Sequence, residues 1–299
     1  MSILHLGYNV QTKTRGKKAM HSLKTLLAVA ATAAVATAGP AINDFSCRSA
    51  VHPNPVVLLH GLGATFYEDL NVLQYWLQGH GYCTFAKTYG AYEGFPFVGG
   101  LKPLNESSTE IKDYILEVKE KTGADKVDLV GHSEGALQTL YVPKFHRDEL
   151  QGSLDKLVAI APPTRGTNFA GLYQLAIDLG NNTRSTVDKI LNTVGCDACT
   201  DLTTDGAGIH RLNDGKPIVQ EGTTLTVIAS RHDELVTPTS TSFVHEEGVN
   251  NIWIQDYCPL DPTGHINEAY NTNVWHLVSN SLDGEVGRKF VCFGAFPGK

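Results

Sequence analysis

Short apolar runs alternate along this chain with longer segments of helical periodicity. The first run, at 55–59, is apolar at every position, which is typical of a parallel strand buried on both faces. Further runs that predict strands lie at 83–89, 126–130, 157–161, 224–229 and 251–255. Because parallel strands need long crossover connections, usually helices, this alternation predicts an α/β fold whose mostly parallel sheet has helices on both faces.

The segment at 108–121 is the clearest helix in the sequence. Its apolar side chains recur at intervals of three and four residues, at Ile111, Tyr114, Ile115 and Val118. A lysine-rich last turn followed by Gly123 predicts where this helix ends. The chain has no internal repeat and no linker, so we expect a single domain over residues 39–299.

One segment does not fit the alternation of strands and crossovers. About 60 residues separate the strand that ends near Ala161 from the strand that begins near Thr224, and they contain helical patterns at 169–179 and 185–194. Long insertions with their own helices often cover a site. We therefore expect a helical cap at about 163–212, and the alternative is a pair of ordinary helices packed on the sheet.

Residues 1–38 have the features of a leader. Five lysine and arginine side chains, and no acid, precede an apolar run at 25–38 that ends in the small residues Ala36 and Ala38. A run of this length is too short to span a bilayer about 30 Å thick but suits a signal peptide, so we expect a secreted, extracellular protein without a transmembrane segment. The alternative is a membrane anchor, and Met20 offers a second start.

Composition and charge exclude several classes of protein. Apolar residues make up 42% of the chain, which is too many for an intrinsically disordered protein. Acids outnumber Lys and Arg by 31 to 24, and five of those cations lie in the leader, so the rest of the chain is more acidic still. Nucleic acids are polyanions and are therefore not expected partners.

The chain has six cysteines, an even number that suits an oxidised, exported protein. Many pairings of six cysteines are possible, and their spacing favours Cys47 with Cys83, Cys196 with Cys199, and Cys258 with Cys292. Cys196 and Cys199 also form the CxxC half of a zinc site, but the sequence has no second CxxC motif to complete it. Asn105 and Asn181 lie in sequons and are candidate glycosylation sites in a eukaryotic host.

The pentapeptide Gly131-His132-Ser133-Glu134-Gly135 follows the run at 126–130 directly and opens a helical segment. A GxSxG motif in this setting is typical of a nucleophile elbow, in which a sharp turn holds the serine in a strained conformation. The residues two positions before and after the serine must be small, and glycines stand at both. We therefore predict Ser133 as a nucleophile that projects above the sheet, with a helix N-terminus directed at the developing oxyanion.

A serine hydroxyl is a weak nucleophile without a base, so the chain must also supply a histidine and an acid that orients it. In chains with this motif the acid comes first and the histidine second. Asp233 comes directly after the strand predicted at 224–229, at the end of the strand where parallel sheets place their sites. Asp233 is the predicted acid, and Glu234 is the adjacent alternative.

The base must follow the last strand and lie on a loop that can bend toward the serine. Among the twelve histidines, His265 meets both conditions. His245 precedes the strand predicted at 251–255, and His276 lies in a helical pattern where a packed histidine is the plainer interpretation. His265 is therefore the predicted base.

Two backbone N–H groups are needed to bind the oxyanion of an acyl-transfer reaction. The residue after the nucleophile supplies one, so we predict Glu134 as the first donor. The loop after the first strand, His60-Gly61-Leu62-Gly63, supplies the other, and Leu62 is the predicted donor. We interpret His60 as a residue that shapes this loop rather than as a base.

The chain resembles the bacterial class 2 lipase family and its fungal secreted relatives, in the segments PVVLLHG, GYCTFAKTYG, VDLVGHSEGALQTLY, SRHDELVTP and GHINEAYN. The resemblance runs from about Asn43 to Cys292. It implies an α/β-hydrolase fold and serine hydrolysis of lipid esters, with Ser133, Asp233 and His265 as nucleophile, acid and base. The first and third cysteine pairs named above also match the family's usual cysteine positions.

Two residues depart from the family pattern. Glu134 stands where a glutamine is common, and Ala136 stands where a glycine is common. A carboxylate beside the oxyanion hole would weaken the stabilisation of the oxyanion or change the pH dependence of the reaction.

We therefore expect a secreted serine hydrolase that cleaves carboxylic esters of apolar acyl chains, a triacylglycerol lipase or esterase that forms an acyl-enzyme. The partners we expect are ester or lipid substrates, met at a lipid–water interface by a monomer. No metal or organic cofactor is implied, because the sequence has neither a ligand cluster nor a phosphate-binding loop. The alternatives are a cutinase-like polyesterase, a short-chain carboxylesterase and, in another class, a non-catalytic α/β-hydrolase-like binding protein.

Overall fold

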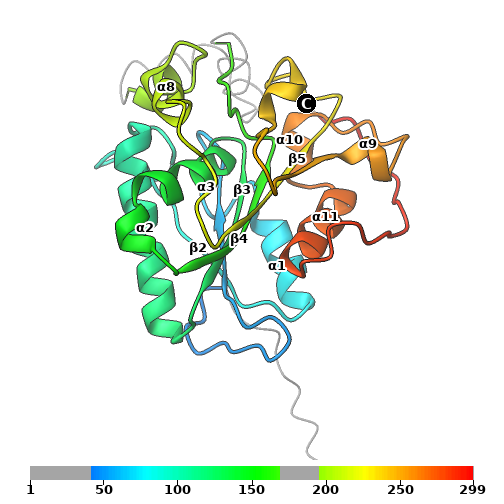
Figure 1. Cartoon of the computed structure of the whole chain (residues 1–299), viewed down its shortest axis with the longest axis horizontal. Helices are drawn as coiled ribbons and strands as arrows, with labels where there is room; N and C mark the ends of the chain where they lie inside the picture. Colours follow the sequence, from blue (N-terminus) through cyan, green and yellow to red (C-terminus); the bar gives the residue numbers. More distant parts are fainter. Residues whose placement is uncertain (1–41, 169–194, 299) are drawn as a thin grey trace, which may run out of the picture. The chain divides into compact units, whose positions relative to one another are not determined.

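Six strands form one sheet in the order β2-β1-β3-β4-β5-β6, and every neighbouring pair is parallel. The computed structural model describes residues 42–168 and 195–298 (Figure 1). The strands are β1 (Val56–Leu59), β2 (Thr84–Ala86), β3 (Val127–His132), β4 (Leu154–Ile160), β5 (Thr224–Ala229) and β6 (Asn250–Trp253). The mostly parallel sheet predicted from the apolar runs is therefore confirmed.

The strand β1 is apolar throughout because both faces of the sheet are covered. Val57 and Leu59 pack into one hydrophobic core, and Val56 and Leu58 pack into the other. All four side chains are almost fully buried. Burial of each contributes about 1.5–3 kcal/mol to folding, so a polar residue at any of these positions would be costly.

Helices on the two faces supply the two cores. The helices α2 (Leu104–Thr122) and α3 (Glu134–Phe145) cover one face, while α1 (Asn71–Gly79) and α11 (Thr272–Leu282) cover the other (Figure 1). The apolar stripe predicted at 108–121 is buried in α2, which begins four residues earlier, directly after Pro103. This helix ends where predicted, at Gly123, whose φ of 67° is the left-handed conformation that glycine adopts without strain.

Two predicted strands, both at a sheet edge, end two or three residues earlier than expected. The run at 83–89 forms strand only over Thr84–Ala86, because β2 lies at the sheet edge and pairs with only three residues of β1. The strand predicted at 251–255 ends at Trp253, because the next residues form the short helix α9 (Ile254–Tyr257). Both differences concern edge strands, where pairing on one side leaves the ends weakly specified.

The insertion predicted at 163–212 is described only in part. Its helical patterns at 169–179 and 185–194 lie outside the described residues. The described part contains α7 (Asp197–Asp201) and α8 (Ala207–Leu212), and Leu202, Ile209 and Leu212 pack into the core that α2 and α3 cover. The other short elements are α4 (Arg147–Leu150), the 3₁₀-helix η1 (Thr239–Ser242) and α10 (His265–Glu268).

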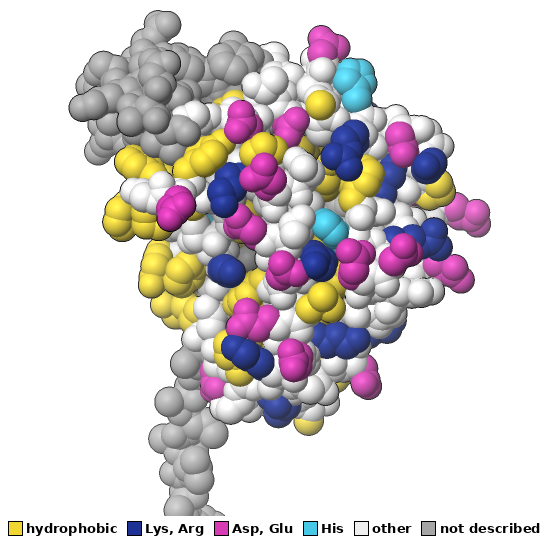
Figure 2. Space-filling view, turned by 90° about the vertical axis from the view of Figure 1, so that its left-hand side faces the viewer, with side chains coloured by type: hydrophobic (Ala, Val, Ile, Leu, Met, Phe, Trp, Pro, Cys, Tyr) yellow, Lys and Arg dark blue, Asp and Glu magenta, His cyan; other side chains and the backbone are white. Residues whose placement is uncertain are grey.

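The surface over α2 carries charges of both signs side by side (Figure 2). The ion pairs on and beside this helix are Lys102 with Glu110, Lys112 with Asp113, and Lys121 with Glu117. Exposed pairs of this kind contribute at most about 1 kcal/mol each, so the buried stripe accounts for most of the stability of α2. In residues 42–168 and 195–298, no helix is both long enough and apolar enough to cross a membrane.

The disulfide pairing predicted from spacing is confirmed. Cys47 pairs with Cys83, Cys196 with Cys199, and Cys258 with Cys292. The third bond joins the segment before α10 to the C-terminal segment. Of the two sequons, Asn105 is exposed in the first turn of α2, and Asn181 lies outside the described residues.

We expect the Cys258–Cys292 bond to contribute more to stability than the Cys196–Cys199 bond. Their sequence separations are 34 and 3, and a longer closed loop removes more entropy from the unfolded chain. Replacing both cysteines of the longer loop by alanine should lower the free energy of unfolding by about 3–4 kcal/mol, against about 2 kcal/mol for the shorter loop. Urea denaturation of the two double variants measures this, and equal losses would contradict it.

Candidate active site

Ser133 lies at the turn between β3 and α3, in a backbone conformation with φ 55° and ψ −120°. Non-glycine residues seldom adopt a positive φ, and this one is held by close packing on either side. A Cβ at Gly131 would collide with the backbone of Gly135, and a Cβ at Gly135 would collide with the Leu59 carbonyl of β1. The two glycines of the motif are therefore needed because other backbone segments touch them.

The structure brings Ser133, His265 and Asp233 together. His265 Nε2 lies 2.9 Å from Ser133 Oγ, and His265 Nδ1 lies 2.8 Å from Asp233 Oδ2. The serine follows β3 directly, the acid lies in the loop after β5, and the histidine begins α10, which comes after β6 and α9, so segments that follow three parallel strands supply the three side chains. All three are buried, with exposed fractions of 7%, 1% and 4% for the serine, histidine and acid.

The Asp233 carboxylate is held by two backbone N–H groups. Its Oδ1 accepts hydrogen bonds from the N–H groups of Leu235 and Val236, at 2.8 and 2.9 Å. Burial alone would raise the pKa of Asp233, but the charge and hydrogen bond of His265 and these two N–H groups together hold it below the ordinary value of 3.8. The acid is therefore ionised at neutral pH, and its other oxygen, Oδ2, faces His265 Nδ1.

The alternatives considered from the sequence have other contacts. The Glu234 carboxylate accepts from the backbone N–H of His265, at 3.3 Å, and does not face its ring. His276 stacks on Phe290 from α11, and His245 is exposed before β6. Among these residues, only His265 has its ring on Ser133.

The two residues predicted to bind an oxyanion lie beside Ser133. Glu134 is the first residue of α3, so its N–H has no acceptor within the helix. Leu62 lies in the loop after β1, and a Cβ on its neighbour Gly61 would approach Ser133 Cβ to 3.2 Å. The ring of His60 stacks on Tyr89 with centroids 4.3 Å apart, and its Nδ1 lies 2.8 Å from the Gly61 carbonyl. His60 thus shapes this loop and is not directed at the serine.

A buried pair that the sequence analysis missed connects this loop to His265. His132 Nδ1 lies 2.7 Å from Asp69 Oδ1, and His132 Nε2 lies 3.0 Å from the His265 carbonyl. Because both ring nitrogens face oxygen acceptors, both carry hydrogens and His132 is an imidazolium. Asp69 Oδ2 also accepts from the Gly61 N–H, at 2.6 Å. In the sequence, the place of His132 in the GxSxG motif was the one feature that could have indicated its role. No feature of the sequence indicated Asp69.

The charges of this pair support each other. Burial lowers the pKa of His132, but the Asp69 charge, the hydrogen bonds to Asp69 and to the His265 carbonyl, and the Asp233 charge together raise it above 6.5. Burial raises the pKa of Asp69, but the His132 charge and the hydrogen bonds of His132 and Gly61 hold it below 3.8. An ionised pair therefore spans the space between the loop after β1, residues 60–63, and the loop that carries His265.

A second acid that the sequence analysis missed, Glu268, lies behind the triad in α10. Its side chain is fully buried, and the backbone of Ser230 lies near its carboxyl oxygens but is too far or too poorly aligned for an ordinary hydrogen bond within the described residues. Burial and the nearby Asp233 charge raise the pKa of Glu268 well above 4.5, so it is a neutral acid. Ligand atoms of Asp233, His265 and Glu268 lie within 4.8 Å of one another, but Asp233 and His265 already bind each other.

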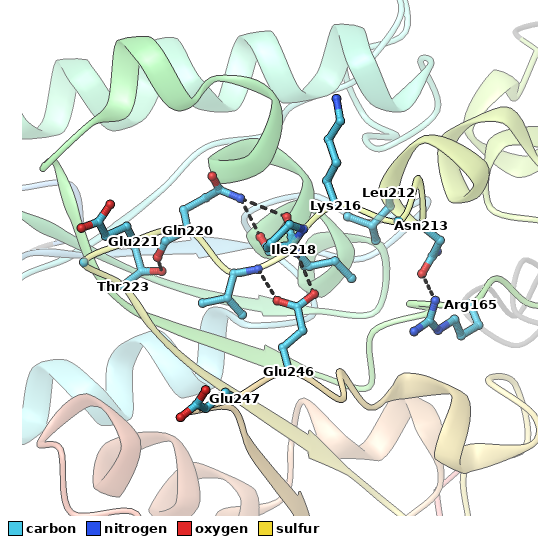
Figure 3. Close-up of a pocket in the computed structure, with 14 residues that line it drawn as sticks. Arg165, Leu212, Asn213, Lys216, Ile218, Gln220, Glu221, Thr223, Glu246 and Glu247 are labelled. Atoms are coloured by element: carbon cyan, nitrogen blue, oxygen red, sulfur yellow. Dashed lines mark hydrogen bonds between the residues drawn. The ribbon is translucent and has the colours of Figure 1, made fainter.

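An open cavity of about 680 Å³ is lined by residues from 212–223 together with Arg165, Glu246 and Glu247 (Figure 3). No triad residue lines it. Its main polar groups already have partners, since Glu246 accepts from the N–H groups of Ile218 and Val219, and Arg165 donates to Asn213. Among the described residues that line the cavity, no serine or cysteine lies beside a histidine, so it offers no arrangement like the one at Ser133.

The family model for lipases of class 2 matches residues 53–276 of this chain. Triacylglycerol lipases of Pseudarthrobacter phenanthrenivorans and Burkholderia plantarii are each 37% identical to it over 127 residues, which is 40% of this chain. The matched region covers only 36% and 32% of those two proteins, so the chain spans about a third of the length of the curated relatives it matches.

Solved structures of lipases share the fold. Aspergillus fumigatus lipase B has a TM-score of 0.57 at 18% identity, with 82% of this chain and 53% of that chain covered. The Bacillus licheniformis lipase BlEst2 has a TM-score of 0.53 at 14% identity, with 82% and 96% covered. Together with the parallel six-stranded sheet, these likenesses confirm the expected α/β-hydrolase fold.

We expect Asp69→Asn to destabilise the chain by about 3–5 kcal/mol, because it leaves the His132 imidazolium buried without its counter-charge. The rate at which an acylating probe reacts with Ser133 should also fall about 10–100-fold, since the loop of Gly61 and the loop of His265 lose their common anchor. Denaturation and initial rates measure the two effects. Glu149→Gln is the control, because it removes the partly exposed ion pair between Glu149 and His146 at the start of α4. This variant should lose less than about 1 kcal/mol of stability. Equal losses of unfolding free energy in the two variants would refute the role of the Asp69–His132 pair in holding the two loops.

Proposed function

Because this chain belongs to the class 2 lipase family, we propose that it is a carboxylic ester hydrolase that cleaves esters of apolar acyl chains, triacylglycerols among them. One observation carries the proposal: Asp233, His265 and Ser133 form a continuous hydrogen-bonded line with contacts of 2.8 and 2.9 Å. This is the arrangement that makes a serine hydroxyl nucleophilic. It also disfavours a non-catalytic binding protein, which has no need of an intact triad.

The reaction we propose is acyl transfer in two stages. His265 Nε2 takes the proton of Ser133, whose Oγ attacks the ester carbonyl carbon, and the N–H groups of Leu62 and Glu134 bind the oxyanion. The imidazolium then gives its proton to the alcohol oxygen as the carbonyl–oxygen bond breaks, which leaves an acyl-serine. Water, deprotonated by the same imidazole, attacks the acyl carbon, and the imidazolium returns the proton to Ser133 Oγ as the bond between the acyl carbon and Oγ breaks, which releases the carboxylic acid.

Asp233 acts on His265 and not on the substrate. Its carboxylate accepts the Nδ1 hydrogen, which leaves Nε2 as the acceptor of the serine proton and stabilises the imidazolium that forms. The two N–H groups that bind its other oxygen keep the carboxylate in place.

Apolar side chains beside the oxyanion loop support an apolar substrate. The loop after β1 is joined to the segment at 91–101 by backbone hydrogen bonds between Gly63 and Gly99 and between Gly99 and Ala64. Tyr67 and Phe97, one from each segment, are 73% and 77% exposed. The apolar residues of the insertion that also suggest such a substrate, at 169–191, lie outside the described residues.

We also propose that the protein is secreted after removal of residues 1–38, and that residues about 163–212 form a cap over the site. The three disulfides support the first proposal, because such bonds persist in oxidising compartments. The helical periodicity of the insertion supports the second.

A fluorophosphonate probe tests the nucleophile. We expect one covalent adduct on the peptide that contains Ser133, lost in Ser133→Ala together with about 10⁴–10⁶-fold of the turnover number. Ser240→Ala, which removes an exposed hydroxyl from η1, is the control and should keep both labelling and activity. Peptide mapping by mass spectrometry reads the result, and labelling that survives in Ser133→Ala would refute the assignment.

A series of nitrophenyl esters from acetate to dodecanoate tests the substrate class. Each CH₂ that becomes buried contributes about 0.8 kcal/mol, so kcat/KM should rise about fourfold per CH₂ until the binding site is filled. A maximum at acetate would instead favour a short-chain carboxylesterase. Release of soluble acids from a polyester film, with little activity on emulsified triacylglycerol, would favour a cutinase-like polyesterase.

A further inference from the structure

The side chain of Glu134 is buried beneath the loop after β1, the oxyanion loop at residues 60–63. It can therefore have a role separate from that of the backbone N–H of the same residue. The side chain is fully buried, and a Cβ on Gly100 would collide with its Oε2 and come within 3.3 Å of Leu62 Cα. The carboxyl group therefore lies against the loop that supplies the second proposed oxyanion donor. It makes hydrogen-bond contacts with only two side chains among the described residues, Tyr89 and Gln138.

Counting hydrogens assigns a proton to this carboxyl group. Tyr89 Oη lies 2.6 Å from the His60 carbonyl and 3.0 Å from Glu134 Oε2. A carbonyl oxygen can only accept, so the single hydrogen of Tyr89 is used on His60. The contact between Tyr89 and Glu134 is then a hydrogen bond only if Oε2 carries a hydrogen and donates it.

Gln138 fixes which carboxyl oxygen is protonated. Its Nε2 lies 3.2 Å from the Leu104 carbonyl, which sets the orientation of the amide, and 3.3 Å from Glu134 Oε1. Gln138 therefore donates to Oε1, and Oε2 is left to carry the hydrogen that faces Tyr89. Both carboxyl oxygens, the tyrosine hydroxyl and the His60 carbonyl are all paired only in this arrangement.

The surroundings favour the neutral acid. The loop after β1 contributes His60, whose ring stacks on Tyr89, and beyond it the Asp69–His132 pair. The 91–101 segment contributes only backbone, at Gly100, and α2 contributes the Leu104 carbonyl through Gln138. No cation forms an ion pair with Glu134 among the described residues. Burial raises the pKa of Glu134 to about 8, which agrees with the hydrogen count.

We propose that Glu134 works as a neutral carboxylic acid that donates to Tyr89 and, through it, holds the His60 carbonyl and the oxyanion loop against the nucleophile. Its side chain is a positioning group, distinct from its backbone N–H, and this role rests on the proposed hydrolase function. When the acid ionises, the Tyr89 hydrogen turns to the carboxylate and releases His60. A buried negative charge then also lies beside the developing oxyanion, which opposes its formation.

Alkaline rate profiles test this positioning role. The turnover of tributyrin, followed by pH-stat, should fall about tenfold in the wild type between pH 7 and pH 9.5, as the acid ionises near pH 8. Glu134→Gln should lose this fall, because an amide supplies an N–H donor to Tyr89 at every pH. A fall of the same size in Glu134→Gln would overturn the proposal.

Tyr89→Phe separates the relay from ordinary packing. We expect a loss of about tenfold in kcat with less than a twofold change in KM, since the oxyanion loop is released while substrate contacts remain. Tyr114→Phe is the matched control, because it removes another buried tyrosine hydroxyl that donates to a backbone carbonyl, that of Ala86, at 3.2 Å. The control should keep the wild-type rate and pH profile, and wild-type kcat in Tyr89→Phe would overturn the relay.

Melting temperatures test whether Glu134 is protonated, by a measurement that does not depend on enzyme activity. The unfolded chain releases this proton above the ordinary value of 4.5, whereas the folded chain retains it until about pH 8. The wild type therefore loses stability relative to Glu134→Gln as pH rises through this window. The gap, defined as the Tm of Glu134→Gln minus the Tm of the wild type, should widen in favour of the variant from pH 5 to pH 8.5. A constant gap would refute the neutral acid. An inactive wild type with a widening gap would instead refute only the proposed hydrolase function.

Discussion

The strained backbone of Ser133 is the constraint around which the rest of the site is arranged. A positive φ at a non-glycine residue costs about 1–3 kcal/mol and persists only when the surrounding structure enforces it. Here β1 and the first turn of α3 press against the two glycines of the motif. The turn lifts the hydroxyl above the carboxyl end of the sheet, where loops from β5 and β6 can reach it.

Two buried polar networks hold the neighbouring loops on either side of Ser133. On one side, the Asp69–His132 pair connects the Gly61 N–H to the His265 carbonyl. On the other side, Tyr89 connects the His60 carbonyl to Glu134. Buried polar groups are costly unless every one is paired, so each network has one favourable arrangement and thereby fixes the loops relative to Ser133.

The features predicted correctly are those that leave a local pattern in the sequence. The unbroken apolar run of β1 shows burial on both faces, and the spacing of Ile111, Tyr114, Ile115 and Val118 shows the buried stripe of α2. Pairing at the sheet edges leaves no such pattern, and the ends of β2 and β6 were accordingly predicted too long. The cysteine pairs followed from spacing because each bond closes a short stretch of chain.

By itself the sequence determined the kind of fold, the elbow motif and which serine, acid and histidine stand at the ends of strands, because each depends on periodicity, small residues or chain order. Only the tertiary structure decided which other polar groups support them. Asp69 and His132 are 63 residues apart and Tyr89 and Glu134 are 45 apart, and no local pattern joins either pair. The charge state of a buried side chain depends on its neighbours in space, so the proton on Glu134 is a property of the folded chain and not of the residue type.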